Sequence, residues 1–215
     1  GAFALQAAFW WNTRDMRPSF AVVPPVPTRE AIQALAFGDG QFLYRALGLN
    51  IQNAGDDGGR FTPLKNYDYG RLEGWFMALD GLDPVADFVP VVAGYYYSNT
   101  LKRDDVRHVV AYLRHHAMRD PARKWRWLAH AVYLARHKVK DQRLALDAAR
   151  QLAGLSVPDL PAWTRQMPAF ILADLGEDEA ARAVLMGIIA TDPNLPDEER
   201  AFIADYLNRR LRGVK

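Results

Sequence analysis

Prolines recur along this chain at a nearly constant interval, and this interval constrains the fold more than any other feature. Pro84, Pro121, Pro158 and Pro193 lie 37, 37 and 35 residues apart, each after an amphipathic stretch. Because proline lacks an N–H donor but suits the first turn of a helix, each predicts the end of one helix and the start of another. Units of this length predict pairs of antiparallel helices that stack and share a core.

Positions inside these units repeat at a matching distance. Val109, Ala145 and Ala181 are 36 residues apart, each early in the second helix expected of its pair. Turns between helices are expected in step, at residues 102–104, 138–140 and 175–177. We therefore predict an all-α fold, an α-solenoid of antiparallel helical hairpins with a period of about 36 residues. Four hairpins are expected in a right-handed stack that ends in a C-terminal capping helix.

Two regions depart from this regular pattern. Residues 38–82 predict a helix over 38–53, a long loop and a helix around Trp75, which we interpret as an atypical first hairpin. The tyrosine run at 95–97 prefers a strand locally, but its neighbours place it in a helix. The capping helix is expected to bury one apolar stripe, formed by Phe202, Tyr206 and Leu207.

The last complete unit, residues 169–193, has a small residue, a turn glycine, a second small residue, a large residue and a proline, in the order Ala169, Gly176, Ala181, Leu185, Pro193. In this order it resembles a tetratricopeptide repeat. Trp163 lies near the usual first-helix tryptophan position without occupying it, and Ile188 replaces a small residue. The two preceding units match more loosely and exceed the usual length of about 34 residues, nearer the Sel1-like variant.

This resemblance covers residues 84–195 and implies a protein-binding or assembly role without catalytic residues. The segment from Gly38 through Tyr69 also resembles uncharacterised membrane-anchored proteins of alphaproteobacteria, and this second resemblance implies no activity. The chain has no G-x-S-x-G motif and no distinctive carboxylate pair, so we expect neither an enzyme nor a cofactor.

The N-terminal segment is apolar. Residues 1–11 carry no charge, with Gln6 as their polar residue, but a membrane span needs about 20 apolar residues. We interpret residues 1–17 as the end of a membrane anchor; the alternative is an apolar helix docked on the domain's own core. Residues 18–27 contain four prolines and predict an extended linker to a helical domain over 28–215. The side chains expected to contact lipid are Phe3, Leu5, Phe9, Trp10 and Trp11.

Composition bears on compartment and partner. With 27 basic and 25 acidic residues, the chain lacks the basic excess of a dedicated nucleic-acid binder. It has no cysteine, which fits an oxidising compartment, so we expect the helical domain on the periplasmic side of a bacterial inner membrane. The predicted function is a membrane-tethered scaffold or accessory subunit that binds a protein partner in a membrane complex. A soluble peptide-binding regulatory repeat protein is the alternative.

Two aromatic and basic segments are candidate contact sites for the partner. The first follows the glycine-rich turn at residues 55–59 and consists of Arg60, Phe61, Tyr67 and Tyr69. The second lies between residues 119 and 127 and consists of Arg123, Lys124, Trp125 and Arg126. Such clusters suit RNA, anionic headgroups or an acidic partner. The alternative for the second segment is that Trp127 packs between hairpins while its basic neighbours are solvated.

Five histidines lie within 30 residues, at His108, His115, His116, His130 and His137. If the helices carrying them faced each other, four imidazoles could converge on zinc or copper, which leaves a small metal-dependent enzyme as a second alternative. Metal sites on helices more often use ligands three or four residues apart. We therefore predict that none of the five ligates a metal, and that the histidines beside Arg107, Arg114 and Arg136 are solvated.

Overall fold

The computed structural model describes residues 2–13, 21–57 and 60–210, and these are predominantly helical, which confirms the all-α class. The N-terminal elements are α1 (Ala2–Thr13), α2 (Arg29–Leu35), α3 (Gly40–Gln52), β1 (Asp56–Asp57), β2 (Arg60–Phe61), the 3-10 turn η1 (Leu64–Asn66) and α4 (Tyr69–Leu82). The strands β1 and β2 form a short antiparallel pair with Asp56 opposite Phe61. This pair lies within the loop expected after the first long helix.

The remaining elements follow in the chain order α5 (Phe88–Val91), the π-helical η2 (Val92–Tyr96), the 3-10 turn η3 (Tyr97–Asn99), α6 (Arg103–Arg119), α7 (Pro121–Tyr133), the π-helical η4 (Leu134–Val139), α8 (Gln142–Ala153), α9 (Ala162–Asp174), α10 (Asp178–Thr191) and α11 (Asp197–Arg210). The tyrosine run is helical, as expected from its neighbours.

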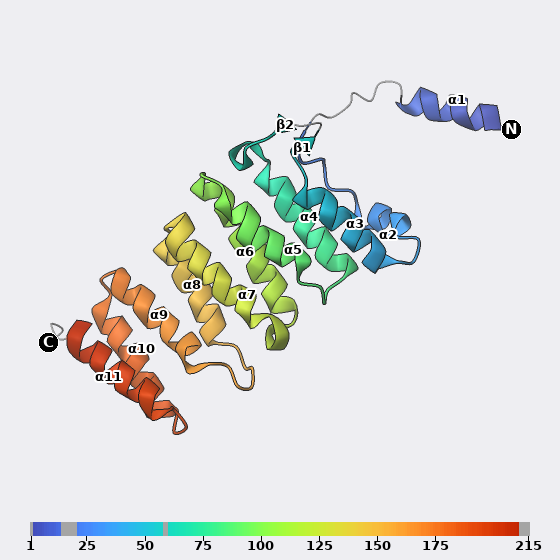
Figure 1. The fold of residues 1–215 in the computed structure, drawn as a ribbon. Coiled ribbons are helices and arrows are strands. Elements are labelled where there is room, and N and C mark those ends of the chain that lie inside the picture. Colours follow the sequence, from blue (N-terminus) through green and yellow to red (C-terminus); the bar gives the residue numbers. More distant parts are fainter. Residues whose placement is uncertain (1, 14–20, 58–59, 211–215) are drawn as a thin grey trace.

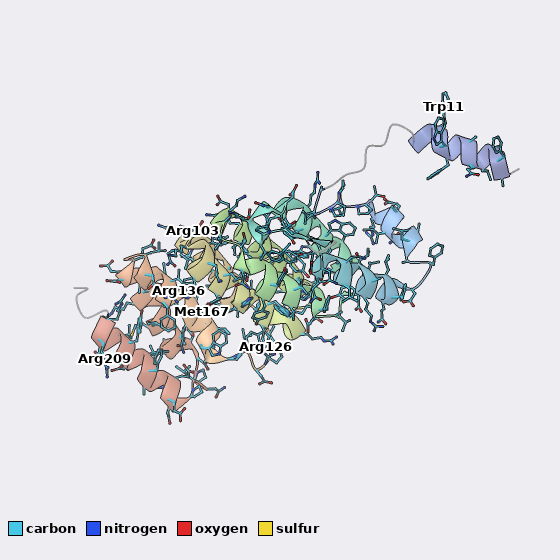
Figure 2. The ribbon with its side chains drawn as sticks, turned by 45° about the horizontal axis from the view of Figure 1, so that its top comes forward. Trp11, Arg103, Arg126, Arg136, Met167 and Arg209 are labelled. Atoms are coloured by element: carbon cyan, nitrogen blue, oxygen red, sulfur yellow. The ribbon has the colours of Figure 1, made fainter. Side chains whose placement is uncertain are left out.

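Helices α2 to α11 follow one another along a single stack, with α2 and α3 at one end and α11 at the other (Figure 1). From α6 onward, each long helix packs chiefly on the next one along the chain. The first helix, α1, lies apart from this stack in both views (Figures 1 and 2). One end of the stack therefore carries the N-terminal helices α2 to α4, which α1 precedes in the chain, and the other end carries the C-terminal helix α11 (Figure 1).

The four spaced prolines lie at helix boundaries, as predicted. Helix α4 ends at Leu82, before Pro84, and α10 ends at Thr191, before Pro193. Between α6 and α7 only Asp120 is non-helical, and Pro121 occupies the first turn of α7, where its missing N–H costs nothing. Pro158 lies in the connection between α8 and α9.

The core runs continuously through the stack. Val109, Ala145 and Ala181 are all fully buried, in α6, α8 and α10 respectively. The capping helix departs from its predicted stripe, because Ile203 and Leu207 are buried whereas Phe202 is about half exposed. Phe202 instead meets the rings of Phe170 and Tyr206 at the edge of the core.

The proline-rich segment is not a free linker, which corrects the expectation for its described part. Residues 21–27, called the strap below, form neither helix nor strand, bend at Val22 and Val23, and lie against α4. The indole Nε1 of Trp75 donates to the carbonyl of Pro24 over 2.9 Å, and Arg71 Nη1 donates to the carbonyl of Val23 over 3.1 Å. Because an extended proline-containing backbone leaves its carbonyls free, side-chain donors from α4 can hold it.

The apolar helix α1 is exposed. Its side chains Phe3, Leu5, Phe9, Trp10 and Trp11 are 61 to 85% exposed, and Trp11 projects from α1 away from the stack (Figure 2). This exposure fits the expectation that they do not dock on the domain's core, whereas contact with lipid stays a prediction. No helix within the described ranges combines the length and the apolar character that a membrane span needs.

Candidate partner-binding face

The predicted contact site in the first loop is largely internal. Tyr67 and Tyr69 are buried, which corrects their assignment to a contact surface. Their hydroxyls donate to backbone carbonyls of Ala54 and Tyr97 respectively, the latter over 2.8 Å. Burial raises the pKa of both phenols. Their rings therefore fill space in the interior beside α4 and do not belong to a surface that a partner could contact.

The other two residues of that site differ. Phe61 in β2 is 70% exposed, so it remains available for contact. The backbone of Arg60 pairs with β1, but its side chain lies outside the described part of the structure. Of the four predicted loop residues, therefore, one is placed on the surface.

The second predicted segment is divided between core and surface. Lys124 and Trp125 are buried, which corrects the expectation for both. Lys124 Nζ donates to the carbonyl of Pro84, and burial lowers its pKa. Trp125 packs against Leu128 and against the ring of Trp163, and the centroids of the two tryptophan rings are 5.8 Å apart.

Arg123 and Arg126 of the same segment are exposed, and the Arg126 guanidinium lies 4.6 Å over the Trp125 ring. Figure 2 shows Arg126 at the surface of the stack. Trp127 is partly buried and donates its indole N–H to Asp87 over 2.9 Å. Trp127 thus packs between neighbouring hairpins as the alternative proposed, but its neighbour Lys124 is not solvated.

A row of rings forms a face that the sequence did not reveal. The members of this aromatic face are Tyr95, Trp127, His130, Tyr133 and His137. The ring centroids of Tyr95 and His130 are 4.6 Å apart, and those of Tyr133 and His137 are 4.9 Å apart. Tyr95 is 60% exposed and Tyr133 49%, so these rings present large apolar surfaces to solvent.

Helical spacing and a glycine build this face. On α7 and η4, Trp127, His130, Tyr133 and His137 follow one another at steps of three, three and four residues, so each ring lies about one helical turn from the next. Gly94 in η2 lets α7 come close, because a Cβ there would lie 3.0 Å from the His130 ring. His130 Nε2 in turn lies 3.1 Å from the Gly94 carbonyl oxygen, which fixes the ring beside Tyr95.

Two grooves adjoin the aromatic face on either side of Tyr95. One, of about 480 Å³, is lined mainly by apolar and aromatic side chains, among them Phe61, Phe88, Val91 and Tyr96, with Asp56 at the lining as well. The other, of about 440 Å³, includes Asn99, His130, Tyr133 and Lys138. Tyr95 therefore borders both grooves, one lined mainly by apolar side chains and the other by polar and basic side chains.

Between them, the two segments that carry the aromatic face contain basic residues but no acidic ones. Residues 88–99 and 121–139, which span α5 to η3 and α7 to η4, contain no Asp or Glu. The second of these segments contains Arg123, Lys124, Arg126, Arg136 and Lys138. Arg136 is paired with Asp174 of α9, and Lys124 is buried. Arg123, Arg126 and Lys138 remain exposed, although Arg123 Nε lies 4.0 Å from Asp120.

The five histidines do not gather at one point. His115 and His137 are exposed, and His108 Nδ1 lies 2.6 Å from Glu73. Within the described ranges, no three His, Cys, Asp or Glu side chains are close enough together to hold a metal ion. Of the three histidines expected to be solvated, His108 is partly buried instead, and His116, whose environment was not predicted, is fully buried.

His116 belongs to a buried polar cluster centred on Asp80. One Asp80 carboxylate oxygen lies 2.6 Å from His116 Nδ1, and the other accepts a hydrogen bond from the Tyr112 hydroxyl over 2.9 Å. Arg119 Nη1 donates to the Asp80 carbonyl over 2.7 Å and lies 3.8 Å from its carboxylate. Burial, followed by the charge of Asp80, raises the pKa of Tyr112.

This cluster is closed to a substrate, because Asp80, Tyr112 and His116 are each fully buried. His116 Nε2 makes no hydrogen bond within the described structure; Asp87 Oδ1 lies 3.9 Å away. An Asp–His pair orients and polarises an imidazole, but chemistry would also need a reactant within reach of Nε2. The arrangement ties α4 to α6 through charge-assisted hydrogen bonds.

Comparisons with protein-family models, curated proteins and solved structures found no match to this chain.

Proposed function

We propose that this protein is a non-catalytic scaffold or accessory subunit, built as a tetratricopeptide-like α-solenoid and tethered to a membrane, that binds a protein partner. The observation that carries the proposal is the aromatic face, in which Tyr95, Tyr133 and His137 are exposed and pack beside the partly buried rings of Trp127 and His130. Exposed aromatic groups beside arginine are the composition that protein interfaces favour. The closed Asp80 cluster, by contrast, offers no route for a substrate.

The solenoid is supported by contacts between residues that lie about one repeat apart in sequence. Glu73 and His108 are 35 residues apart, Asp80 and His116 are 36 apart, and Gly94 and His130 are 36 apart. The pair Arg136 and Asp174, 38 apart, continues the series. Contacts at separations close to the repeat length are the pattern expected when each repeat touches mainly its neighbour.

The partner's chemistry follows from the face. An acidic segment that also carries apolar side chains suits this face, because the segments that carry it contain no Asp or Glu and Lys138 lines the groove beside His130 and Tyr133. Arg126 is exposed four residues before His130 on α7, and Asp87, which accepts a hydrogen bond from Trp127, is a carboxylate that contacts the face. The acidic segment's apolar side chains would enter the groove at Phe88 and Val91, and its carboxylates would lie toward His130 and Lys138. We therefore propose an acidic protein segment, from a subunit of an integral membrane complex, as the ligand.

The tether is supported by α1, whose apolar side chains are exposed around the helix. A helix that is apolar on all sides is stable only when something covers it. We propose that lipid covers these side chains, with the helical domain on the periplasmic side of the membrane. The soluble alternative uses the same aromatic face and differs only in what covers α1.

Site-specific photocrosslinking tests the partner-binding face. A photoreactive phenylalanine analogue replaces Tyr133 in the full chain, and irradiation is carried out in native membranes. We expect one crosslinked protein, and an Arg126→Glu change should reduce its yield about 10-fold, because a like charge then faces the acidic segment. Lys102→Glu, which makes the same charge change at an exposed position in the turn before α6, should leave the yield unchanged. Equal losses in both variants would contradict the proposal.

Vesicle sedimentation tests the tether. The full chain should sediment with phospholipid vesicles, and Trp10→Ser with Trp11→Ser should weaken this binding, since both remove apolar surface from α1. Deleting residues 1–17 should release a soluble, folded helical monomer that retains the strap. If the full chain stays in the supernatant while the Tyr133 crosslink persists, the soluble peptide-binding alternative replaces the tether.

A further inference from the structure

The strap occupies a groove on α4 that is built to receive an extended backbone. Trp75 and Arg71, one helical turn apart, donate to the consecutive carbonyls of Pro24 and Val23. Between them, Gly74 leaves room for the strap, because a Cβ at Gly74 would lie 2.9 Å from Val26 Cγ2. A glycine between two donors therefore lets the chain approach closely enough for both hydrogen bonds.

The strap is held by few contacts. Val23 is its one deeply buried side chain, whereas Val22 and Val26 are half-buried and Pro24 and Pro25 are exposed. Beside it remains a groove of about 490 Å³, lined in part by Val22, Val23, Leu47 and Trp75. The strap thus fills its groove incompletely, in contrast to the closely packed helices behind it. Segments with few buried apolar contacts open locally at lower free energy than the fold as a whole.

We propose that the α4 groove at Arg71, Gly74 and Trp75 is a reversible binding site for an extended, proline-containing segment, and that the strap is its ligand. The helical stack remains folded when the strap leaves. Recognition depends on backbone carbonyls and on a valine side chain, which is the way aromatic-lined grooves bind polyproline-like segments.

Release would change the length of the tether, a consequence that rests on the proposed membrane attachment. With the strap docked, residues 14–20 join α1 to the stack and span at most about 25 Å. With the strap released, residues 14–28 do so and span at most about 54 Å. The strap would therefore set how far the aromatic face stands from the membrane.

An engineered disulfide tests the docked position, and the absence of native cysteine keeps the readout clean. A Cβ built at Gly74 lies 3.8 Å from Val26 Cβ, which is the usual separation in a disulfide. Val26→Cys with Gly74→Cys should form a disulfide under mild oxidation, seen as a mobility shift on a non-reducing gel. Val26→Cys with Gly81→Cys, on the same helix in open space, should not. Equal or absent crosslinking in both would overturn the docked position.

Thiol labelling tests reversibility. Single cysteines replace buried Val23 in the strap, fully buried Ala148 in the core and exposed Ser156 in a loop. We expect Cys at 23 to react at least about 10-fold more slowly than at 156 and at least about 10-fold faster than at 148, because the strap opens without global unfolding. A rate equal to that at 156 would mean that the strap is not docked. A rate equal to that at 148 would mean that it is a permanent part of the core.

The donor from Trp75 supplies the sharper variant. Trp75→Phe removes the indole N–H and keeps an aromatic ring, so the labelling rate at position 23 should rise about fivefold while that at 148 stays constant. An unchanged rate at 23, or a parallel rise at 148, would overturn the assigned role of Trp75. These measurements use the full chain in solution, so they stand or fall independently of membrane binding and of the Tyr133 crosslink.

Discussion

The two halves of the stack solve the same packing problem with different side chains. From α3 to α6, the core contains the buried tyrosines Tyr44, Tyr67, Tyr69, Tyr97 and Tyr112. After α6 the chain has two further tyrosines, Tyr133 and Tyr206, and neither is buried. The buried small residues from α7 to α10 include Ala131, Ala145, Ala148, Ala149, Ala169 and Ala181, all fully inaccessible.

This difference determines what each half depends on. Buried phenols need hydrogen-bond partners, and Tyr97 meets this need by donating to the Ile51 carbonyl over 2.5 Å. Alanine needs no partner but lets helix backbones approach, so added volume has nowhere to go. The N-terminal half should therefore respond most to lost polar partners and to alkali, and the C-terminal half to changes in side-chain volume.

The largest expected effect is at the buried cluster of the N-terminal half. Asp80→Ala should lower the free energy of unfolding by about 3–5 kcal/mol, because His116 and Tyr112 lose their partner inside the core. Urea unfolding followed by circular dichroism measures this. Asp147→Ala, which breaks an exposed ion pair with Arg114, should cost less than about 1 kcal/mol. Similar losses for both would mean that the cluster does not tie α4 to α6.

The second prediction concerns alkaline pH. Burial raises the pKa of Tyr44 to about 12, from an ordinary value of about 10. A raised phenol pKa means that the folded state favours the neutral form, so its contribution is fully present below pH 10 and is lost as pH rises toward 12. Tyr44 should account for about 2–3 kcal/mol of this loss.

Urea unfolding at pH 8, 10 and 11 measures the first part of this loss, about 1.4 kcal/mol by pH 11. Tyr44→Phe cannot titrate, so its stability should fall less steeply above pH 10 than that of the unmodified protein. Tyr69, Tyr97 and Tyr112 also have raised pKa values and should keep part of the alkaline dependence. Identical pH profiles for the two proteins would argue against buried phenols as the cause.

In the C-terminal half, volume should matter more. Ala181→Leu should cost on the order of 1–3 kcal/mol, because its position in α10 is fully buried and close-packed. Ala183→Leu, two residues further along the same helix and exposed, should change stability by less than about 0.5 kcal/mol. Thermal or urea unfolding compares the two variants. A neutral result at 181 would show that α9 and α10 can move apart to admit the larger side chain.

The smallest predicted effect compares two turns 36 residues apart. Gly176 after α9 and Lys140 after η4 both have positive φ, 76° and 59° respectively. Glycine adopts this conformation without a Cβ clash, whereas lysine is strained. Lys140→Gly should therefore stabilise the protein by about 0.5–1 kcal/mol, and Gly176→Ala should destabilise it by about 1 kcal/mol. Opposite signs in one set of melting curves would confirm that the two turns are equivalent.

The burial of some residues in the two predicted contact segments could be predicted from the sequence, and that of others could not. The exposure of Arg123 and Arg126 could be predicted because arginine is rarely buried. Lys124 lies four residues before Leu128 on the same side of α7, a spacing that signals its burial once the helix is known. Tyr67 and Tyr69 carry no such signal, because a loop aromatic beside charged residues has the same local pattern whether it is buried or exposed.

The sequence by itself determined the all-α class and the helix boundaries at the spaced prolines, because these depend on interactions within about four residues. Tertiary structure decided that Asp80 meets His116, that Tyr95 lies beside His130 and that the strap turns back onto Trp75. These pairs are 36, 35 and 51 residues apart in sequence, and the stacking of helices brings them together. Local patterns do not encode such distances, so the buried cluster and the aromatic face appear only when the helices are packed.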